Sequence, residues 1–243
     1  MSAAYRVIGD PRADGILIVA DHASNLVPAS IDLGLSEDQL SQHIAWDIGV
    51  AAVAERLCLQ FGYAAFLGAV SRLVVDCNRE RDSGSAIPNY SDDMHIKGNI
   101  LNAAQHKERI VNYYDPYHNA LSQLLENHRP ALIISLHSFT PMLSSDPLQS
   151  RPWEIGILYN EYETASHWMI KELNDAGLNV GDQQPYSGKQ LNATMNRHAE
   201  GNDIPYIGIE MRQDLVTEKA DIDRFVQIIG KSCNKIAKKL ATP

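Results

Sequence analysis

The chain has 243 residues, of which 44% are hydrophobic and 21% charged, and this is ordinary usage for a globular protein with a sizeable core. Its formal net charge of −9 argues against a non-specific nucleic-acid binder, which needs a basic face, although a few local arginines would still allow an anionic ligand. With no CxxC pair among three cysteines, no signal peptide and no apolar run long enough to span a membrane, we expect a soluble cytoplasmic protein without disulfides or a membrane partner.

The first predicted element is a buried strand over residues 16–20. It is an aliphatic run that ends in the polar side chains of Asp21, His22, Ser24 and Asn25. Ligands of α/β proteins bind at the carboxyl ends of parallel strands. His22 is therefore well placed for a site, although a histidine alone in such a turn more often has only a structural role.

A long helix is predicted next. Ser36 and Gln39 form a capping box, and the helix that they open is expected to cover residues 37–61. His43 and Asp47 lie one turn apart beside its apolar stripe. They form either a surface pair, which is the commoner case, or a pair that points over the carboxyl edge of the sheet.

Two short strands and a long loop follow. The strands are expected over residues 64–67 and 73–75, and the loop over residues 80–99. Long loops in compact domains are usually functional or mobile, so this loop could cover a site. A helical region over residues 101–127 is predicted to break or kink near Asp115, because proline follows at position 116.

The second half of the chain alternates strands with helices. Its clearest strand covers residues 131–136 and delivers His137, and its last strand covers residues 205–209 and delivers Glu210. The remaining predicted elements are strands over residues 154–159 and 178–180 and helices over residues 161–176, 192–199 and 217–240. The alternation predicts a single α/β domain over residues 1–243, with a mainly parallel sheet.

Three strands thus end in His22, His137 and Glu210, and Arg72 and Arg79 flank a fourth. Two imidazoles and an oxygen ligand are a common way to hold a catalytic zinc ion. Such an ion acidifies water and polarises a carbonyl, a free carboxylate can move the proton, and an arginine can stabilise an oxyanion. The simpler interpretation of both arginines is a surface ion pair, with Asp76 or Asp82.

Five motifs resemble those of the N-formylglutamate amidohydrolase family. They are Asp21-His-Ala-Ser-Asn25, His43-Ile-Ala-Trp-Asp-Ile-Gly49, Ser71-Arg-Leu-Val-Val-Asp-Cys-Asn-Arg79, Ser135-Leu-His-Ser-Phe-Thr-Pro141 and Ile209-Glu-Met-Arg212. That family is similar to the zinc carboxypeptidase and aspartoacylase group. The resemblance implies a mixed sheet between helices, the fold also described as phosphorylase/hydrolase-like.

The resemblance also implies roles for single residues. His22 and His137 correspond to metal ligands, Arg72 to the residue that stabilises the oxyanion, and Glu210 to the general base. Asn78 and Arg79 correspond to the pair that binds the substrate carboxylate. Apart from the resemblance, Arg197 in the predicted helix over residues 192–199 is a further candidate for the pocket. The implied cofactor is a divalent metal ion, with zinc as the first choice.

One position departs from the wider group, because Asn25 stands where that group has a glutamate ligand. A neutral amide is a poorer ligand for zinc than a carboxylate. Three alternatives stay open: Asn25 binds through its oxygen, Asp47 supplies the third ligand, or the affinity for metal is low.

The leading hypothesis is a metal-dependent amidohydrolase of amino-acid catabolism that converts N-formyl-L-glutamate to formate and L-glutamate. The second is a related deacylase or carboxypeptidase that acts on another acyl amino acid. The third is a non-catalytic carboxylate-binding protein on the same fold, which the neutral Asn25 keeps open.

Overall fold

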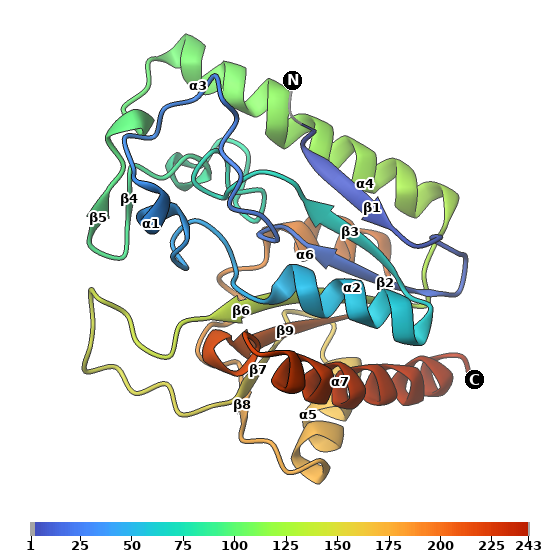
Figure 1. Ribbon diagram of the computed structural model, residues 1–243. Coiled ribbons are helices and arrows are strands. Elements are labelled where there is room, and N and C mark those ends of the chain that lie inside the picture. The colour runs from blue at the N-terminus through green and yellow to red at the C-terminus, as the bar shows by residue number, and fades with distance from the viewer. Residues whose placement is uncertain (1–2, 243) are drawn as a thin grey trace.

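The aliphatic runs of the sequence form the strands of one seven-stranded mixed sheet in the computed structural model, which describes residues 3–242 (Figure 1). Strands β2, β3, β6 and β9 are parallel, whereas β1 and the β7–β8 pair run antiparallel to them. Across the sheet the order is β1 (Tyr5–Ile8), β3 (Ala64–Gly68), β2 (Ile16–Ala20), β6 (Leu132–Phe139), β9 (Tyr206–Arg212), β7 (Ile155–Leu158) and β8 (Val180–Asp182).

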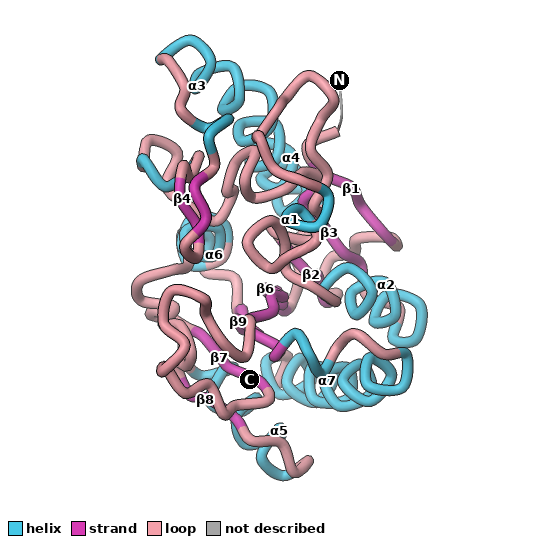
Figure 2. The backbone as a smooth tube through the Cα atoms, turned by 60° about the vertical axis from the view of Figure 1, so that its left-hand side comes forward, coloured by secondary structure: helices cyan, strands magenta, loops and turns pink. Residues whose placement is uncertain are grey.

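Helices cover both faces of this sheet. One face packs against α2 (Val50–Phe61), α5 (Thr164–Asp175) and α7 (Lys219–Leu240). The other packs against α4 (Asp115–Asn127) and α6 (Ala193–His198), and α3 (Ala103–Arg109) precedes α4 in the chain. Figure 2 shows the central strands β6 and β9 between these two layers. The expected α/β fold, a mainly parallel mixed sheet between helices, is confirmed.

The prediction of one helix over residues 37–61 is wrong. The capping box at Ser36 is present, but the helix that it opens, α1, covers only Glu37–Leu40. A turn over residues 41–49 separates it from α2, and Gly49 takes a positive φ of 85° at the N-cap of α2. Most of the apolar stripe therefore lies in a turn and not in a helix, and the same turn carries His43 and Asp47.

The predicted strand over residues 73–75 is also wrong, because this segment forms turns. Two of its backbone carbonyls accept hydrogen bonds from side chains and not from a neighbouring strand. Asn99 Nδ2 donates to the Leu73 carbonyl at 2.8 Å, and Arg109 Nη1 donates to the Val74 carbonyl at 3.2 Å. Buried carbonyls need partners, and here two side chains provide them.

The helical region is not broken near Asp115, because helical turns follow one another without a gap from α3 to α4, but the regular α-helical pattern is interrupted just before this residue. A π-helical turn, Ile110–Tyr114, follows α3, and α4 begins at Asp115 with proline in its first turn. The loop over residues 80–99 contains a short hairpin, β4 (Tyr90–Ser91) and β5 (Met94–His95), that the sequence did not indicate. Strand β1 was likewise not predicted. Among the described residues, no helix has the length and apolar character needed to cross a membrane.

Candidate active site

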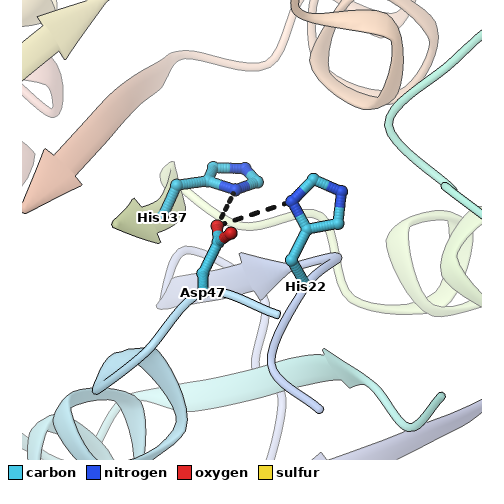
Figure 3. A group of neighbouring side chains, drawn as sticks. All are labelled: His22, Asp47 and His137. Atoms are coloured by element: carbon cyan, nitrogen blue, oxygen red, sulfur yellow. Dashed lines mark hydrogen bonds and ion pairs between the residues drawn. The ribbon is translucent and has the colours of Figure 1, made fainter. Parts of the chain in front are cut away.

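Three buried side chains from distant parts of the chain meet at the carboxyl edge of the sheet. His22 follows β2, Asp47 lies in the turn before α2, and His137 lies near the end of β6. His137 Nδ1 donates to Asp47 Oδ2 at 2.8 Å, and His22 Nδ1 lies 3.4 Å from the same oxygen. Figure 3 shows both rings turned toward Asp47. One ligand atom from each residue fits within 4.8 Å of the others.

The turn over residues 41–49 holds Asp47 in place. The amide of Asp47 donates to the His22 carbonyl at 2.9 Å, which ties the turn to the end of β2. Ser71 Oγ donates to the Ala45 carbonyl at 2.8 Å, which ties it to the next segment of the site. Asp47 thus reaches the histidines because the helix is interrupted before it.

The outer nitrogen of each imidazole faces a second buried carboxylate. His22 Nε2 donates to Asp76 Oδ1 at 2.7 Å. His137 Nε2 lies 3.6 Å from Asp21 Oδ2, and both of these buried atoms are without a hydrogen bond within residues 3–242. Histidines that ligate metals usually present one nitrogen to the ion and donate from the other to such a partner.

Asp21 is itself held by the helix layer behind the sheet. Its Oδ1 accepts a hydrogen bond from Tyr117 in α4 at 2.7 Å and from Thr194 Oγ1 in α6 at 2.9 Å. These bonds orient the carboxylate, so that Oδ2 is the oxygen that faces His137.

The irregular segment after β3 supplies four further polar side chains. Arg72 Nη2 donates to Asp76 Oδ2 at 2.8 Å, and Arg72 Nη1 lies 3.6 Å from Asp47 Oδ1. The amide oxygen of Asn78 accepts from the Thr194 backbone at 3.1 Å, and Arg79 Nη1 donates to the Asn78 carbonyl at 2.9 Å. The Arg72–Asp76 pair exists, but both groups belong to the site and Asp76 is buried.

Glu210 enters the site from β9. It is the register partner of His137 on the neighbouring parallel strand, so the two side chains share one face of the sheet. Its carboxylate is buried, and its Oε2 has no hydrogen-bond partner among the described residues. Burial raises the pKa of Glu210 to about 7, which suits a group that both accepts and returns a proton near neutral pH.

Charges at this site favour a cation between the two rings. Burial lowers the pKa of His22, but Asp76 and Asp47 outweigh that effect, and the pKa is raised. Burial likewise opposes protonation of His137, but the hydrogen bond and charge of Asp47 raise its pKa to about 9. The two histidines in turn lower the pKa of Asp47 despite its burial. The donor set of two imidazoles and one carboxylate also suits zinc.

A cavity of about 150 Å³ lies among these side chains. Its lining consists of His22, His43, Asp47, Arg72, Asn78, Arg79, His137, Ser138, Phe139, Thr140, Tyr186, Leu191 and Glu210. Tyr186 was not singled out by the sequence, because it lies in a loop without a recognisable motif. Its phenol oxygen accepts from Arg151 at 3.0 Å, an arginine that is itself buried.

Two predicted site residues lie elsewhere. Asn25 does not line the cavity, and its Nδ2 donates to the Leu40 carbonyl at the end of α1 at 3.0 Å. Asp47, the other candidate for third ligand, is the one beside the histidines. Arg197 is exposed on α6 and is also outside the lining of the cavity.

The β4–β5 hairpin of the long loop reaches the cavity through one carboxylate. Asp92 Oδ2 lies 3.0 Å from Nε2 of His43, which lines the cavity. Asp92 also accepts from the backbone amides of Ser144 and Ser145 at 3.0 and 2.8 Å. His95 is exposed and is not part of the lining.

A family model described as N-formylglutamate amidohydrolase matches residues 14–217. The chain belongs to the N-formylglutamate amidohydrolase family, a family of hydrolases. The matched residues include every group that lines the cavity. No curated protein sequence matches the chain.

Solved structures share the fold of this chain. A gene product of Agrobacterium tumefaciens is 31% identical, with 98% of this chain and 96% of that chain covered and a TM-score of 0.91. The N-formylglutamate amidohydrolase of Ralstonia eutropha JMP134 is 17% identical, with 98% of both chains covered and a TM-score of 0.73. A bacteriophage poly-gamma-glutamate hydrolase is 11% identical, with 97% and 90% covered and a TM-score of 0.50. The last two likenesses concern the fold.

Proposed function

We propose that this protein is a metal-dependent amidohydrolase that converts N-formyl-L-glutamate to formate and L-glutamate. The proposal rests on one juxtaposition: the buried His22, Asp47 and His137 share a cavity with Glu210, a carboxyl group whose pKa is near 7. Membership of the N-formylglutamate amidohydrolase family supports N-formyl-L-glutamate as the substrate.

His22, Asp47 and His137 are the residues that would hold the metal ion, and Asn25 would have no part in binding it. A zinc ion in such a set acidifies water and polarises the carbonyl that is attacked. The hydrogen bond from His22 to Asp76 supports this role, because it turns Nδ1 of the ring toward the centre of the group.

Glu210 is the proposed general base. Its carboxylate takes a proton from the attacking water and then gives it to the departing amine, so that formate and the free amino acid are released. The raised pKa supports both halves of this cycle, because the carboxyl group exchanges its proton readily at neutral pH.

The arginines carry the proposed electrostatic roles. Arg72, fixed by Asp76, would donate to the formyl oxygen as negative charge develops on it. Arg79 and Asn78 would grip a carboxylate of the substrate. The hydrogen bond from the Thr194 amide orients Asn78 so that its NH₂ group is the part available to a ligand.

The binding-protein alternative loses its main support. That hypothesis depended on a neutral Asn25 in place of a carboxylate ligand. Since Asp47 lies beside the two histidines, a carboxylate is available without Asn25.

The decisive experiment measures glutamate release from N-formyl-L-glutamate by purified protein, first with a chelator and then with zinc or cobalt added back. We expect the chelator to abolish turnover and metal to restore it. Glu210→Gln should lower kcat by at least about a hundredfold while metal binding is retained, because general acid–base catalysis contributes 10²–10⁴-fold. His137→Ala should lose metal and turnover together.

The matched control is His128→Ala, which removes an exposed imidazole far from the cavity and should leave turnover unchanged. Full turnover by folded Glu210→Gln would contradict the mechanism. Metal binding without turnover of the formyl compound would shift the substrate to another acyl amino acid.

A further inference from the structure

A second cavity adjoins the candidate active site. It measures about 250 Å³, and it shares Asn78, Arg79 and Leu191 with the first cavity. Apart from these, its walls carry the carboxylate of Glu80, the methyl group of Ala193 and five uncharged polar side chains: Ser83, Ser85, Gln190, Asn192 and Asn196. A ligand at Arg79 therefore has hydrogen-bonding space on two sides.

Arg79 stands where the two cavities meet. Its side chain is 23% exposed, and Nη2 lies 3.9 Å from Asp76 Oδ2, beyond hydrogen-bonding distance. Nη1 donates to the Asn78 carbonyl, whereas a guanidinium carries five N–H groups. Several donors thus remain for a carboxylate or an amide carbonyl that lies in either cavity.

The chemistry of the second cavity defines what it can bind. Serine hydroxyls and side-chain amides both donate and accept hydrogen bonds, as a peptide group requires. The walls therefore fit a polar residue joined to the substrate through an amide bond.

We propose that the second cavity is a subsite for an additional residue on the carboxyl side of the substrate, so that the protein also deformylates N-formyl-glutamyl dipeptides. This inference rests on the proposed function. The carboxyl group at Arg79 is then an amide, the added residue lies between Ser85 and Gln190, and its own carboxylate pairs with Arg79 from the second cavity. The reaction is unchanged: water adds to the formyl carbon, the C–N bond breaks, and formate and a free dipeptide leave.

The test compares N-formyl-L-glutamate with N-formyl-L-glutamylglycine, linked through either carboxyl group, in the metal-loaded protein. For the wild type we expect at least one dipeptide to reach a kcat/KM within about tenfold of the amino acid. Ser85→Trp fills the second cavity, and Gln190→Glu places a negative charge opposite the added carboxylate. Each should lower kcat/KM for the dipeptide by about tenfold or more and change that for N-formyl-L-glutamate by less than about threefold.

The control Asn174→Trp places the same indole at an exposed position on α5 and should affect neither substrate. Rejection of both dipeptides by the wild type, or equal losses for both substrates in the two variants, would overturn the subsite. If the wild type hydrolyses no formyl compound, the proposed function fails, and calorimetric titration with L-glutamylglycine decides the subsite alone. Binding weakened about tenfold by Ser85→Trp supports it, and unchanged or absent binding overturns it.

Discussion

At the scale of single residues, the two histidines of the site differ in how firmly their rings are held. His22 has a short bond of 2.7 Å from Nε2 to Asp76, whereas His137 Nε2 and Asp21 are 3.6 Å apart. His137 is held instead through Nδ1, which donates to Asp47 at 2.8 Å. The orientation of His22 therefore depends mainly on a residue that would not itself touch the metal.

Asp76→Asn tests this dependence. An amide of the same size keeps the packing but weakens the bond to His22 and removes the charge that raises the pKa of that ring. Loss of such a partner typically lowers metal affinity by about 10–100-fold. We expect a decrease of that size in zinc affinity, measured by competition with a chromogenic chelator.

Asp82→Asn is the matched control, because the Asp82 side chain is 92% exposed and, within residues 3–242, forms an ion pair with Arg81 alone. Its zinc affinity should equal that of the wild type. Unchanged zinc affinity in Asp76→Asn would show that Asp76 serves Arg72 alone and does not position the histidine.

The sequence allowed the chemically active residues at strand ends to be recognised, but it did not show which residues form hydrogen bonds with them. His22, His137 and Glu210 follow aliphatic runs and were expected to meet. Asp76 was interpreted as a surface partner of Arg72, since nothing in the local sequence shows that the segment is buried. Its bond to His22 joins positions 54 residues apart and depends on the tertiary fold.

At the scale of elements, irregular segments deliver much of the site. The turn over residues 41–49 carries Asp47, and the segment over residues 71–79 carries both arginines. Periodicity predicted a helix and a strand in these two places. Each prediction failed because long-range contacts satisfy the backbone there, as Asn99 and Arg109 do for the second segment.

Gly49→Ala should damage both stability and metal binding. Gly49 has a φ of 85°, and a Cβ at this position would lie 2.4 Å from the carbonyl oxygen of Val216. The left-handed conformation alone costs about 1–2 kcal/mol, and the clash with a backbone atom adds to it. We expect a loss of more than about 2 kcal/mol in urea unfolding, together with weaker zinc binding, because Asp47 lies two residues away.

Gly62→Ala provides the control at the other end of the same helix. Gly62 also has a positive φ, 70°, but a Cβ there would meet no atom within 4 Å. The Gly62→Ala variant should lose about 1 kcal/mol of unfolding free energy, which is the cost of the left-handed conformation alone, and should keep its zinc affinity. Equal losses in the two variants would mean that the close approach of Val216 does not matter.

At the scale of the whole molecule, the order of strands in the sheet brings the residues of the candidate active site together. Strands β2, β6 and β9 are neighbours in the sheet, so His22, His137 and Glu210 lie side by side although up to 188 residues separate them. The alternation of strands and helices predicted the fold class, but it does not state which strands are adjacent. The edge strand β1 was missed because Tyr5–Ile8 is short and only partly buried.

Two further histidines link the helix layer to the back of the site. His118 Nε2 donates to the Cys77 carbonyl at 3.0 Å, so its Nδ1 must accept the hydrogen bond from His198 Nε2 at 2.8 Å. Both rings are buried, and their planes are within 7° of parallel. Burial lowers the pKa of His118 to about 4 and, with the charge of His118, lowers that of His198 to about 3. Neither ring assists the proposed reaction, but both must stay neutral in the folded protein.

This pair should make the fold sensitive to acid. In the unfolded chain the histidines take up protons near pH 6.5, whereas in the folded protein they do so only near pH 4 or below. The two neutral rings therefore make their full contribution to the free energy of unfolding above pH 6.5, and this contribution is lost as the pH falls toward 4. At 1.36 kcal/mol for each pKa unit, the first of the two rings accounts for roughly 3 kcal/mol.

His198→Gln removes one of these rings, and the difference in unfolding free energy between wild type and variant isolates the effect. His22 and His137, whose raised pKa values act in the opposite direction, contribute equally to both proteins. Urea unfolding at several pH values between 7.5 and 4.5 should show that the wild type loses stability more steeply than the variant. Parallel curves would mean that the ring of His198 is exposed enough to bind a proton without unfolding, which its burial in the structure argues against.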